Sequence, residues 1–444
     1  MPFADLREFL KFLEEKKELV HIEREVNPVH EIAAYIRKTS DRQGPTLLFD
    51  KVTGSKMRVV GGLFAGQRQL FYALGASDHR SAVEKLVDAI RDPIEPVMSS
   101  NPLSAEIVHT GSDVDLSRLP ILTHSLKDAG PFITMGLAMT KDPETWKRNV
   151  GLYRLQVKGK NRLGILSQQL DIHLRRAEAR GQGLPVAIAL GTSPELLIAS
   201  QWKAPYGVDE LGLSGRLLGR PVELAKAATI DLAVPVHAEI IIEGIVLPNE
   251  RETEGPFGEF SGYYQPPSSK PVIEVTAIAH RKDPIYLAGL TGMPTTDNHI
   301  LKQIPIEATY LRALREKFPE VKAVHFPACG GAAYLLVVSI KKIREREPRN
   351  IMAAAFGMVG PKYVIVVDDD VDIYDLEKVL WAVCTRSQPD QDALVLPQIN
   401  GAPLDPSAIE PLCTGAMGID ATLPKDKPFP DMVTIPGVED VPDF

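Results

Sequence analysis

Two glutamates, Glu254 and Glu259, lie five residues apart and flank the sequence Gly-Pro-Phe-Gly. In a regular strand, side chains at positions i and i+5 point to opposite faces. Glycine and proline allow the chain to turn, which would bring both carboxylates to one site. Converging carboxylates can hold different protonation states, as a proton-transfer pair requires. A charged turn at the end of a hairpin is the alternative, and the spacing alone leaves both interpretations open.

An arginine upstream of the pair is a possible partner for it. Arg154 lies in the segment Arg148-Asn149-Val-Gly-Leu-Tyr-Arg154, which otherwise has the composition of a buried strand. A buried guanidinium needs a partner, and a carboxylate can accept both prongs of its fork. Asn149 and Arg154 face opposite sides of an ideal strand. Both can serve one site only if Asn149 precedes the strand or a bulge intervenes.

The remaining polar residues have simpler interpretations. Asp368-Asp-Asp370 closes an apolar strand, and we interpret it as a cap of the following loop and helix rather than as a metal site. Glu210 begins a predicted helix and could equally be a surface cap, while His237 and His299 are single histidines. The sequence has no phosphate-binding loop, Rossmann fingerprint, zinc-protease motif or serine-hydrolase motif. Kinases, Rossmann dehydrogenases, zincins and serine hydrolases are therefore poor matches.

Length and composition indicate a globular protein of several domains. The chain has 444 residues, of which 44% are hydrophobic and 24% charged, and its net charge of −8 argues against nucleic-acid binding. It has no apolar run of about 18 residues and no signal-peptide pattern at its start. Its three cysteines form neither a disulfide framework nor a zinc site. We predict a cytoplasmic location.

The elements needed to position the polar residues change in type along the chain. Residues 1–110 alternate helices and short strands, residues 111–310 are mostly strands with turn signals, and residues 311–444 return to helix–strand alternation. We therefore predict an α+β multidomain protein with an α/β domain at each end and a central barrel or sandwich. We expect the first helix of the last domain over residues 307–318, and an irregular arm from Pro424 onward.

Four segments in order resemble the UbiD (de)carboxylases. They are Asn149-Val-Gly-Leu-Tyr-Arg154, Pro185-Val-Ala-Ile-Ala-Leu-Gly191, Val234-Pro-Val-His-Ala-Glu-Ile-Ile-Ile-Glu243-Gly244 and Glu254-Gly-Pro-Phe-Gly-Glu259-Phe-Ser-Gly-Tyr-Tyr264. The resemblance extends over nearly the whole chain. It implies that the central domain is a split β-barrel of the flavin-reductase-like, FMN-binding kind. It also implies prenylated FMN, a divalent metal (usually Mn2+) and K+ as cofactors, with a flavin prenyltransferase supplying the flavin.

Position by position, the resemblance assigns site residues. Arg154, Glu254 and Glu259 match the family's catalytic network, with Glu259 as the general acid and Glu254 held by Arg154. The strand backbone at Leu152 and Tyr153 would contact the flavin.

The metal ligands of the family are an Asn, a His and a Glu. Asn149 and Glu210 match the first and last, and these ligands would join the cation to the flavin phosphate. The family's His falls on Gln168, in Ser167-Gln-Gln, where an amide oxygen is an acceptable ligand for a hard cation. His173 is the rival ligand. Many members also carry a Lys near the flavin where this chain has Ala416.

The function that the resemblance implies is a reversible, non-oxidative decarboxylase. Its substrate would be an aromatic, heteroaromatic (furan-, pyrrole- or hydroxybenzoate-type) or α,β-unsaturated carboxylic acid, with His299 as a substrate contact. The alternatives are a decarboxylase of an unsaturated phosphomevalonate, an ordinary FMN oxidoreductase on a split barrel, and a non-catalytic subunit of a carboxylase complex. The family also implies a homodimer or a larger homo-oligomer, with the C-terminal arm as an oligomerisation element.

Overall fold

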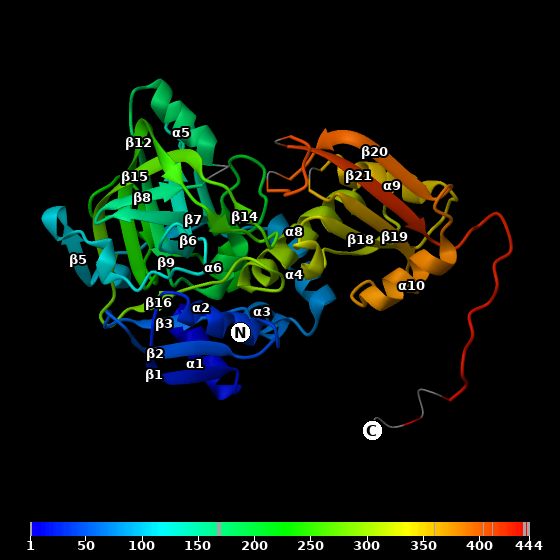
Figure 1. Cartoon of the computed structure of the whole chain (residues 1–444), viewed down its shortest axis with the longest axis horizontal. Coiled ribbons are helices and arrows are strands. Elements are labelled where there is room, and N and C mark those ends of the chain that lie inside the picture. The colour runs from blue at the N-terminus through cyan, green and yellow to red at the C-terminus, as the bar shows by residue number, and fades with distance from the viewer. Residues whose placement is uncertain are drawn as a thin grey trace.

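The N-terminal part of the chain packs helices against a four-stranded sheet of order β1-β2-β3-β16 (Figure 1). The computed structural model describes residues 2–166, 170–358, 360–402, 404–410, 412–437 and 441. The elements of this part are α1 (Leu6–Glu15), β1 (Leu19–Val26), α2 (Glu31–Ser40), β2 (Thr46–Val52), β3 (Arg58–Gly61), α3 (Gln67–Leu74) and α4 (His79–Arg91). The fourth strand of the sheet, β16 (Ile285–Leu287), comes from far along the chain and ties the N-terminal part to the middle of the protein.

The central part is a closed barrel of six strands. The strand order is β12-β9-β6-β7-β8-β15, and pairing of β12 with β15 closes the ring. The strands are β6 (Phe132–Lys141), β7 (Arg148–Gly159), β8 (Arg162–Ile165), β9 (Leu184–Leu190), β12 (Ile240–Glu254) and β15 (Ser268–His280), with β5 (Ile107–Thr110) added outside on β15. The predicted barrel is thus confirmed, and its kinship to flavin reductases stays a prediction.

Short elements surround the barrel. They are α5 (Leu170–Ala179), α6 (Pro194–Ala199), α7 (Glu210–Leu218), the small sheet of β4 (Val97–Met98), β10 (Glu223–Lys226) and β11 (Ala233–Pro235), and the hairpin of β13 (Phe257–Gly258) and β14 (Tyr264–Gln265). Among the described residues, no helix combines the length and apolar composition that a bilayer crossing needs.

The C-terminal part is a five-stranded sheet of order β17-β18-β19-β21-β20. Its elements are β17 (Val321–His325), β18 (Leu335–Ile340), α9 (Glu347–Phe356), β19 (Tyr363–Asp368), α10 (Leu376–Arg386), β20 (Ala393–Asn400) and β21 (Cys413–Ala421). After β21 the chain runs away from the body of the protein as an irregular tail (Figure 1).

The helix α8 (Asp297–Arg315) connects the barrel to the C-terminal sheet. It begins ten residues before the predicted start at Glu307, so that prediction was wrong. The reason is Pro305, which lies inside the helix. An interior proline normally breaks a helix, but here both flanking turns are buried on several sides, and packing outweighs the local cost.

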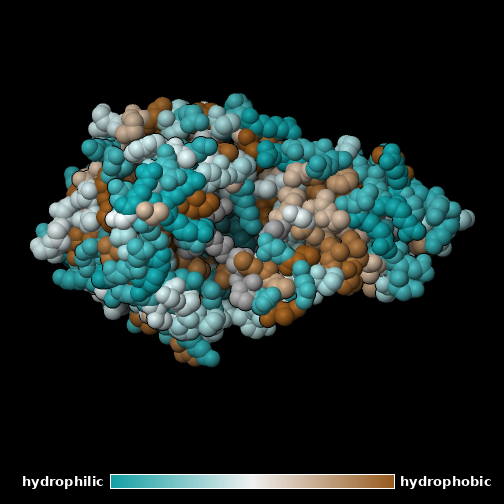
Figure 2. All heavy atoms as spheres, turned by 90° about the horizontal axis from the view of Figure 1, so that it is seen from above, coloured by the Kyte–Doolittle hydropathy of each residue, from teal (hydrophilic) through white to brown (hydrophobic). Residues whose placement is uncertain are grey.

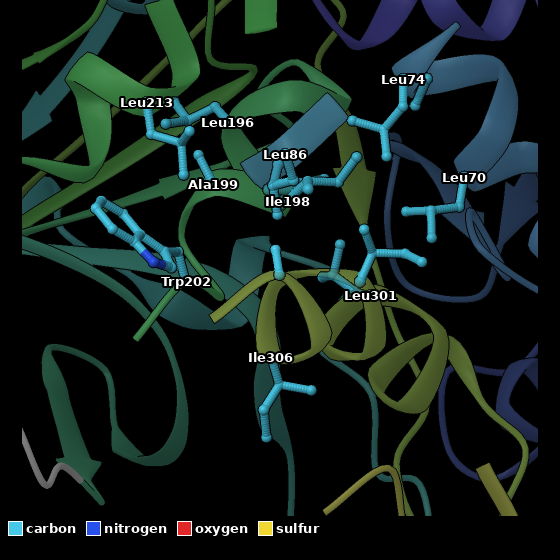
Figure 3. Packing of buried hydrophobic residues seen from close by; sticks show 14 of the residues in the cluster. Leu70, Leu74, Leu86, Leu196, Ile198, Ala199, Trp202, Leu213, Leu301 and Ile306 are labelled. Atoms are coloured by element: carbon cyan, nitrogen blue, oxygen red, sulfur yellow. The ribbon is translucent and has the colours of Figure 1, made fainter. Parts of the chain in front are cut away.

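One continuous hydrophobic core joins the three parts. It includes residues of α3, α4, α6, α7 and α8 as well as strands of the C-terminal sheet. Figure 3 shows this packing, with Leu301 of α8 near Leu86 of α4 and Ile198 of α6. A second cluster fills the barrel and its contact with α2 and α5. The predicted boundaries near residues 110 and 310 stay predictions, because the core itself does not end at either position.

Candidate active site

Arg154 joins the two glutamates of the Gly-Pro-Phe-Gly turn. Its Nε donates to Oε1 of Glu254 at 2.9 Å, and its Nη2 donates to Oε2 of the same carboxylate at 2.7 Å. Its Nη1 donates to Oε1 of Glu259. The guanidinium also lies 5.0 Å from the centroid of the Phe257 ring. The structure therefore brings the three residues together, with Glu254 as the bidentate partner.

The turn that places the glutamates is built by glycine. β12 ends at Glu254, and Gly255 has φ 89°, in the left-handed region that favours glycine. Its N–H donates to the side chain of Gln156 on β7 at 3.1 Å. The hairpin β13–β14 then carries the chain to Glu259, so that both carboxylates reach the same arginine.

Burial sets the electrostatics of Glu259. Burial raises the pKa of this carboxyl, and the charge and hydrogen bond of Arg154 oppose the rise only in part. Glu254 is fully buried, whereas Glu259 keeps 8% of its surface exposed. Glu259 is therefore the carboxyl of the pair that both reaches open space and holds a proton to higher pH than usual.

The open space is a cavity of about 320 Å³ beside Arg154 and Glu259. Its wall includes Gly151 to Arg154 of β7, Ser200 to Lys203 after α6, residues 257, 259 and 260, the strand-following residues 289 to 291, Asn298 and Lys302 of α8, and Leu404. The surface is hollowed between the barrel side and the C-terminal side of the molecule (Figure 2). The C-terminal part helps to cover this region, since Tyr334 stacks on Phe260 with ring centroids 5.6 Å apart.

Two polar atoms in the cavity wall lack partners among the described residues. They are Nε1 of Trp202, a donor, and Oδ1 of Asn298, an acceptor. Buried polar groups are normally paired, so this wall suits a ligand with both donors and acceptors on its edges. A flavin ring system has such edges, and the cavity residues therefore fit the group that the resemblance implies.

A second cavity of about 110 Å³ lies at the start of β7. Asn149, His173 and Glu210 line it together. Asn149 and Arg154 thus open into different cavities, as their spacing on a strand predicts. The β6–β7 ladder does contain a bulge opposite Arg154, but Asn149 itself lies within the regular strand.

The donors of the second cavity suit a divalent cation. Burial raises the pKa of Glu210 to about 7, and its Oε2 accepts a hydrogen bond from Val150 N–H at 3.0 Å. Oδ1 of Asn149 accepts from the Tyr153 hydroxyl at 3.2 Å. Nδ1 of His173 lies 2.9 Å from the Thr140 hydroxyl, which leaves Nε2 as the nitrogen for a ligand. Carboxylate, amide and imidazole donors around one cavity favour a hard or borderline cation, so these residues fit the implied metal.

The other predicted site residues divide into three groups. Leu152 and Tyr153 line the larger cavity. Ser167 and Gln168 lie outside the described residues, so their predicted contacts with flavin and metal stay predictions. His299 is fully buried in α8; its Nε2 lies 2.8 Å from the Phe260 carbonyl and its Nδ1 lies 2.8 Å from the Thr296 hydroxyl. A direct contact between His299 and substrate would require one of these bonds to break.

Asp370, His237 and Ala416 line neither of these two cavities. Asp370 accepts two hydrogen bonds from Arg386, at 2.8 and 2.7 Å. His237 lies 3.2 Å from Glu223. Ala416 is buried within β21.

Sequence reasoning missed two lysines of the cavity wall, Lys203 and Lys302. Lys302 follows Asn298 by four residues, the spacing that puts two side chains on one face of a helix. That signal was hidden because the helix was expected to begin only at Glu307.

Comparison with known proteins places the chain in a family. Models of the N-terminal domain, the Rift-related domain and the C-terminal domain of 3-octaprenyl-4-hydroxybenzoate carboxy-lyase match residues 10–90, 96–294 and 299–421. The chain belongs to the UbiD family and is an enzyme of the carboxy-lyase type.

The similarity to individual known proteins extends over almost the full length of the chain. An uncharacterised protein of Archaeoglobus fulgidus is 35% identical, over 95% of this chain and 92% of that protein. The UbiD-class enzyme HmfF of Pelotomaculum thermopropionicum, solved with FMN, is 39% identical, with 99% of each chain covered and a TM-score of 0.92. An evolved dimeric form of that enzyme was solved with prenylated FMN. Vanillic acid decarboxylase of Sedimentibacter hydroxybenzoicus is 31% identical, over 99% and 98% of the chains, with a TM-score of 0.89.

Proposed function

We propose that this protein is a reversible, non-oxidative decarboxylase of an aromatic, heteroaromatic or α,β-unsaturated carboxylic acid that works with prenylated FMN. The observation that carries the proposal is the Arg154 fork, which holds Glu254 and Glu259 at the wall of a cavity of about 320 Å³. The matches to FMN-bound and prenylated-FMN-bound UbiD-class enzymes support the flavin. A flavin prenyltransferase would be the source of the modified cofactor.

Prenylated FMN, when bound, supplies the electron sink that lets an sp2 carbon lose CO2, and no side chain of the protein can do this. The protein orients the acid and moves a proton. Glu259 in its protonated form donates to the carbon that CO2 has left, and Arg154 keeps the resulting carboxylate in place. Glu254 accepts hydrogen bonds from Nε and Nη2 of Arg154, which keeps the guanidinium from turning toward the substrate.

We assign the divalent cation to the smaller cavity, with Asn149 and Glu210 as ligands. The third ligand is Gln168 by resemblance or His173 by its place in the cavity wall. Variants Gln168→Ala and His173→Ala, compared for manganese content after identical purification, decide between them, since only loss of a true ligand lowers occupancy. K+ is a further expected cofactor, without a residue assignment.

The test of the proposal is an acid panel with two preparations of the enzyme. Protein co-produced with a flavin prenyltransferase should release CO2 from at least one furan-, pyrrole- or hydroxybenzoate-type acid or unsaturated acid, and should catalyse proton–deuterium exchange into the product. Protein loaded with unmodified FMN should do neither. Full activity with plain FMN, or an NAD(P)H-dependent reduction in place of CO2 release, would contradict the proposal and favour an oxidoreductase.

A further inference from the structure

Glu259 directly follows β13, one strand of a very short hairpin. β13 and β14 have two residues each. The N–H of Glu259 points toward the returning chain and donates to the Tyr263 carbonyl at 2.9 Å. Neighbouring residues of an antiparallel pair alternate in their bonding, so the N–H of Gly258 points away from the partner strand. A hairpin of this size is at best marginally stable by itself. The position of Glu259 therefore depends on what holds the free side of β13.

The loop of residues 125–129 holds that free side through Asp128. Oδ1 of Asp128 accepts a hydrogen bond from the Gly258 N–H at 3.0 Å, and Oδ2 accepts from the Ser125 N–H at 2.8 Å. The approach is close, because a Cβ added at Gly258 would lie 3.2 Å from Oγ of Ser125. The Asp128 side chain thus joins the residue before Glu259 to its own loop.

Three further contacts fix this loop in place. The Ala129 N–H donates to the Pro256 carbonyl at 3.0 Å, and the Lys127 N–H donates to the Tyr264 hydroxyl at 3.2 Å. Nε2 of Gln156, on β7 of the barrel, donates to the Ala129 carbonyl at 2.5 Å. The loop is therefore attached both to the hairpin and to the barrel, which makes it a support for the hairpin.

Arg154 also holds Glu259, but it holds the two protonation states unequally. Protonation of the carboxyl removes the attraction between opposite charges and leaves only a hydrogen bond. Glu259 donates its proton from this neutral form, which burial favours by raising its pKa. Restraint of the backbone is therefore needed most in the state that donates the proton.

We propose that Asp128 is a positioning residue that fixes Glu259 through the backbone N–H of Gly258. This inference rests on the proton donation proposed for Glu259. Asp128 is not part of the wall of the larger cavity, so it acts on the reaction only through the hairpin. A proton donor must lie within hydrogen-bond reach of its target, and a misplacement of about 1 Å can cost about 10²-fold in rate. Loss of Asp128 should therefore slow proton transfer and leave binding of the acid unaltered.

The kinetic experiment compares variants of Asp128 as prenylated-FMN holoenzymes, on an acid that the unaltered enzyme turns over. We expect Asp128→Ala to lower kcat by about 10- to 100-fold, with KM and flavin content unchanged. Asp128→Asn keeps an oxygen that can accept from the Gly258 N–H, so it should restore most of the rate. Asp115→Ala is the matched control, because Asp115 is also half-buried and accepts from a backbone N–H, that of Ser117 at 3.0 Å, but within its own turn.

Hydrogen–deuterium exchange of the same proteins gives a measurement that does not depend on turnover. The amides of residues 254–265 should exchange faster in Asp128→Ala than in Asp115→Ala, by about fivefold or more, the scale of one lost hydrogen bond. In Asp128→Asn they should exchange nearly as slowly as in the unaltered protein.

Two results would overturn the inference. In one, Asp128→Ala has the kcat of the control. In the other, its rate falls only through a higher KM or loss of flavin, while the hairpin exchanges as slowly as in the control. If the unaltered enzyme turns over no acid, the proposed function fails, and hydrogen–deuterium exchange still decides the role of Asp128. Faster exchange of residues 254–265 in Asp128→Ala then supports the placement of Glu259 by Asp128, and unaltered exchange refutes it.

Discussion

Two buried carboxylate clusters of this protein use similar parts and differ in what surrounds them. In the first, Arg154 holds Glu254 and Glu259 beside the larger cavity. In the second, His79 of α4 and His325 of β17 hold Glu307 of α8. Nε2 of His79 lies 2.5 Å from Oε2 of Glu307, and Nδ1 of His325 lies 3.0 Å from Oε1.

In the second cluster both oxygens of the Glu307 carboxylate are bonded. Oε1 of Glu307 also accepts from Phe326 N–H at 2.7 Å, and the residue has no exposed surface. Burial alone would raise the pKa of Glu307, but the two histidines outweigh it and bring the pKa to about 2. Imidazoles and a carboxylate can bind metals, yet here one nitrogen of each ring already faces the carboxylate. The cluster therefore joins α4, α8 and β17 through the carboxylate.

The first cluster is compensated only in part, which leaves the pKa of Glu259 raised and its surface open to the cavity. The contrast teaches that burial of a carboxylate is not a sign of function by itself. An incompletely paired carboxyl beside open space can exchange a proton, whereas a fully paired one in a sealed core stabilises the fold.

The largest expected effect comes from removing the exchangeable proton. Glu259→Gln should lower kcat by about 10²- to 10⁴-fold, the usual contribution of a general acid, while flavin content and thermal stability change little. Turnover and proton–deuterium exchange of the holoenzyme measure this. Glu252→Gln, on the preceding strand and half-exposed, is the control. Rates of Glu259→Gln equal to those of the control would remove the distinction between the two clusters.

Glu307→Gln should lower the free energy of unfolding and change turnover little. Breaking a buried ion pair on one side costs about 3 kcal/mol of unfolding free energy, and kcat per folded enzyme should fall far less than in Glu259→Gln. Urea unfolding reports the stability, with Glu316→Gln, an exposed change on the same chain segment, as control. If the Glu307→Gln protein were fully stable but lacked turnover, Glu307 would have a role in the reaction and not in the stability of the fold.

A third buried carboxyl can sharpen the comparison. Glu210 has a pKa raised to about 7 by burial, so it belongs with Glu259 among the incompletely paired acids. We expect Glu210→Gln to weaken Mn2+ binding by at least about tenfold, because the proposed site would lose its charged ligand. Manganese titration monitored by electron paramagnetic resonance checks this. Glu223→Gln should bind manganese normally, and equal affinities in both variants would argue against the metal site.

The smallest effects concern pH, and the two clusters should respond with opposite signs. Glu307 has a lowered pKa, so its stabilisation is present above pH 4.5, its ordinary value, and is lost as the pH falls toward about 2. The difference in unfolding free energy between the unaltered protein and Glu307→Gln should therefore shrink over that range. A difference that stays constant down to pH 2 would contradict the ion pairing.

Glu259 has a raised pKa, so its proton is present at low pH and leaves as the pH rises through that value. Turnover should therefore decline on the alkaline side, and the residual rate of Glu259→Gln should lack this decline. A turnover that rises throughout with pH would exclude Glu259 as the proton donor.

The first cluster could be predicted from the sequence because the residue types themselves indicate that they pair. A buried arginine demands a carboxylate, and a Gly-Pro-Phe-Gly turn lets Glu254 and Glu259 reach it. The second could not, because His79 is 228 residues from Glu307 and the three residues meet only through packing of α4 and β17 on α8. The barrel was predictable from strand alternation, whereas β20 and β21 went unrecognised at the end of the chain. Pro305 hid the first turns of α8, and with them the place of Lys302 in the cavity wall.

Because α8 is continuous through Pro305, the buried cluster at Glu307 helps to position the part of the helix that lines the larger cavity. Lys302 and Glu307 are five residues apart on one helix, about 7.5 Å along its axis. Glu307 is held by His79 and His325. These contacts limit the movement of the helix, and with it the position of the Lys302 side chain. We expect Glu307→Gln to loosen this part of the cavity wall as well as the fold.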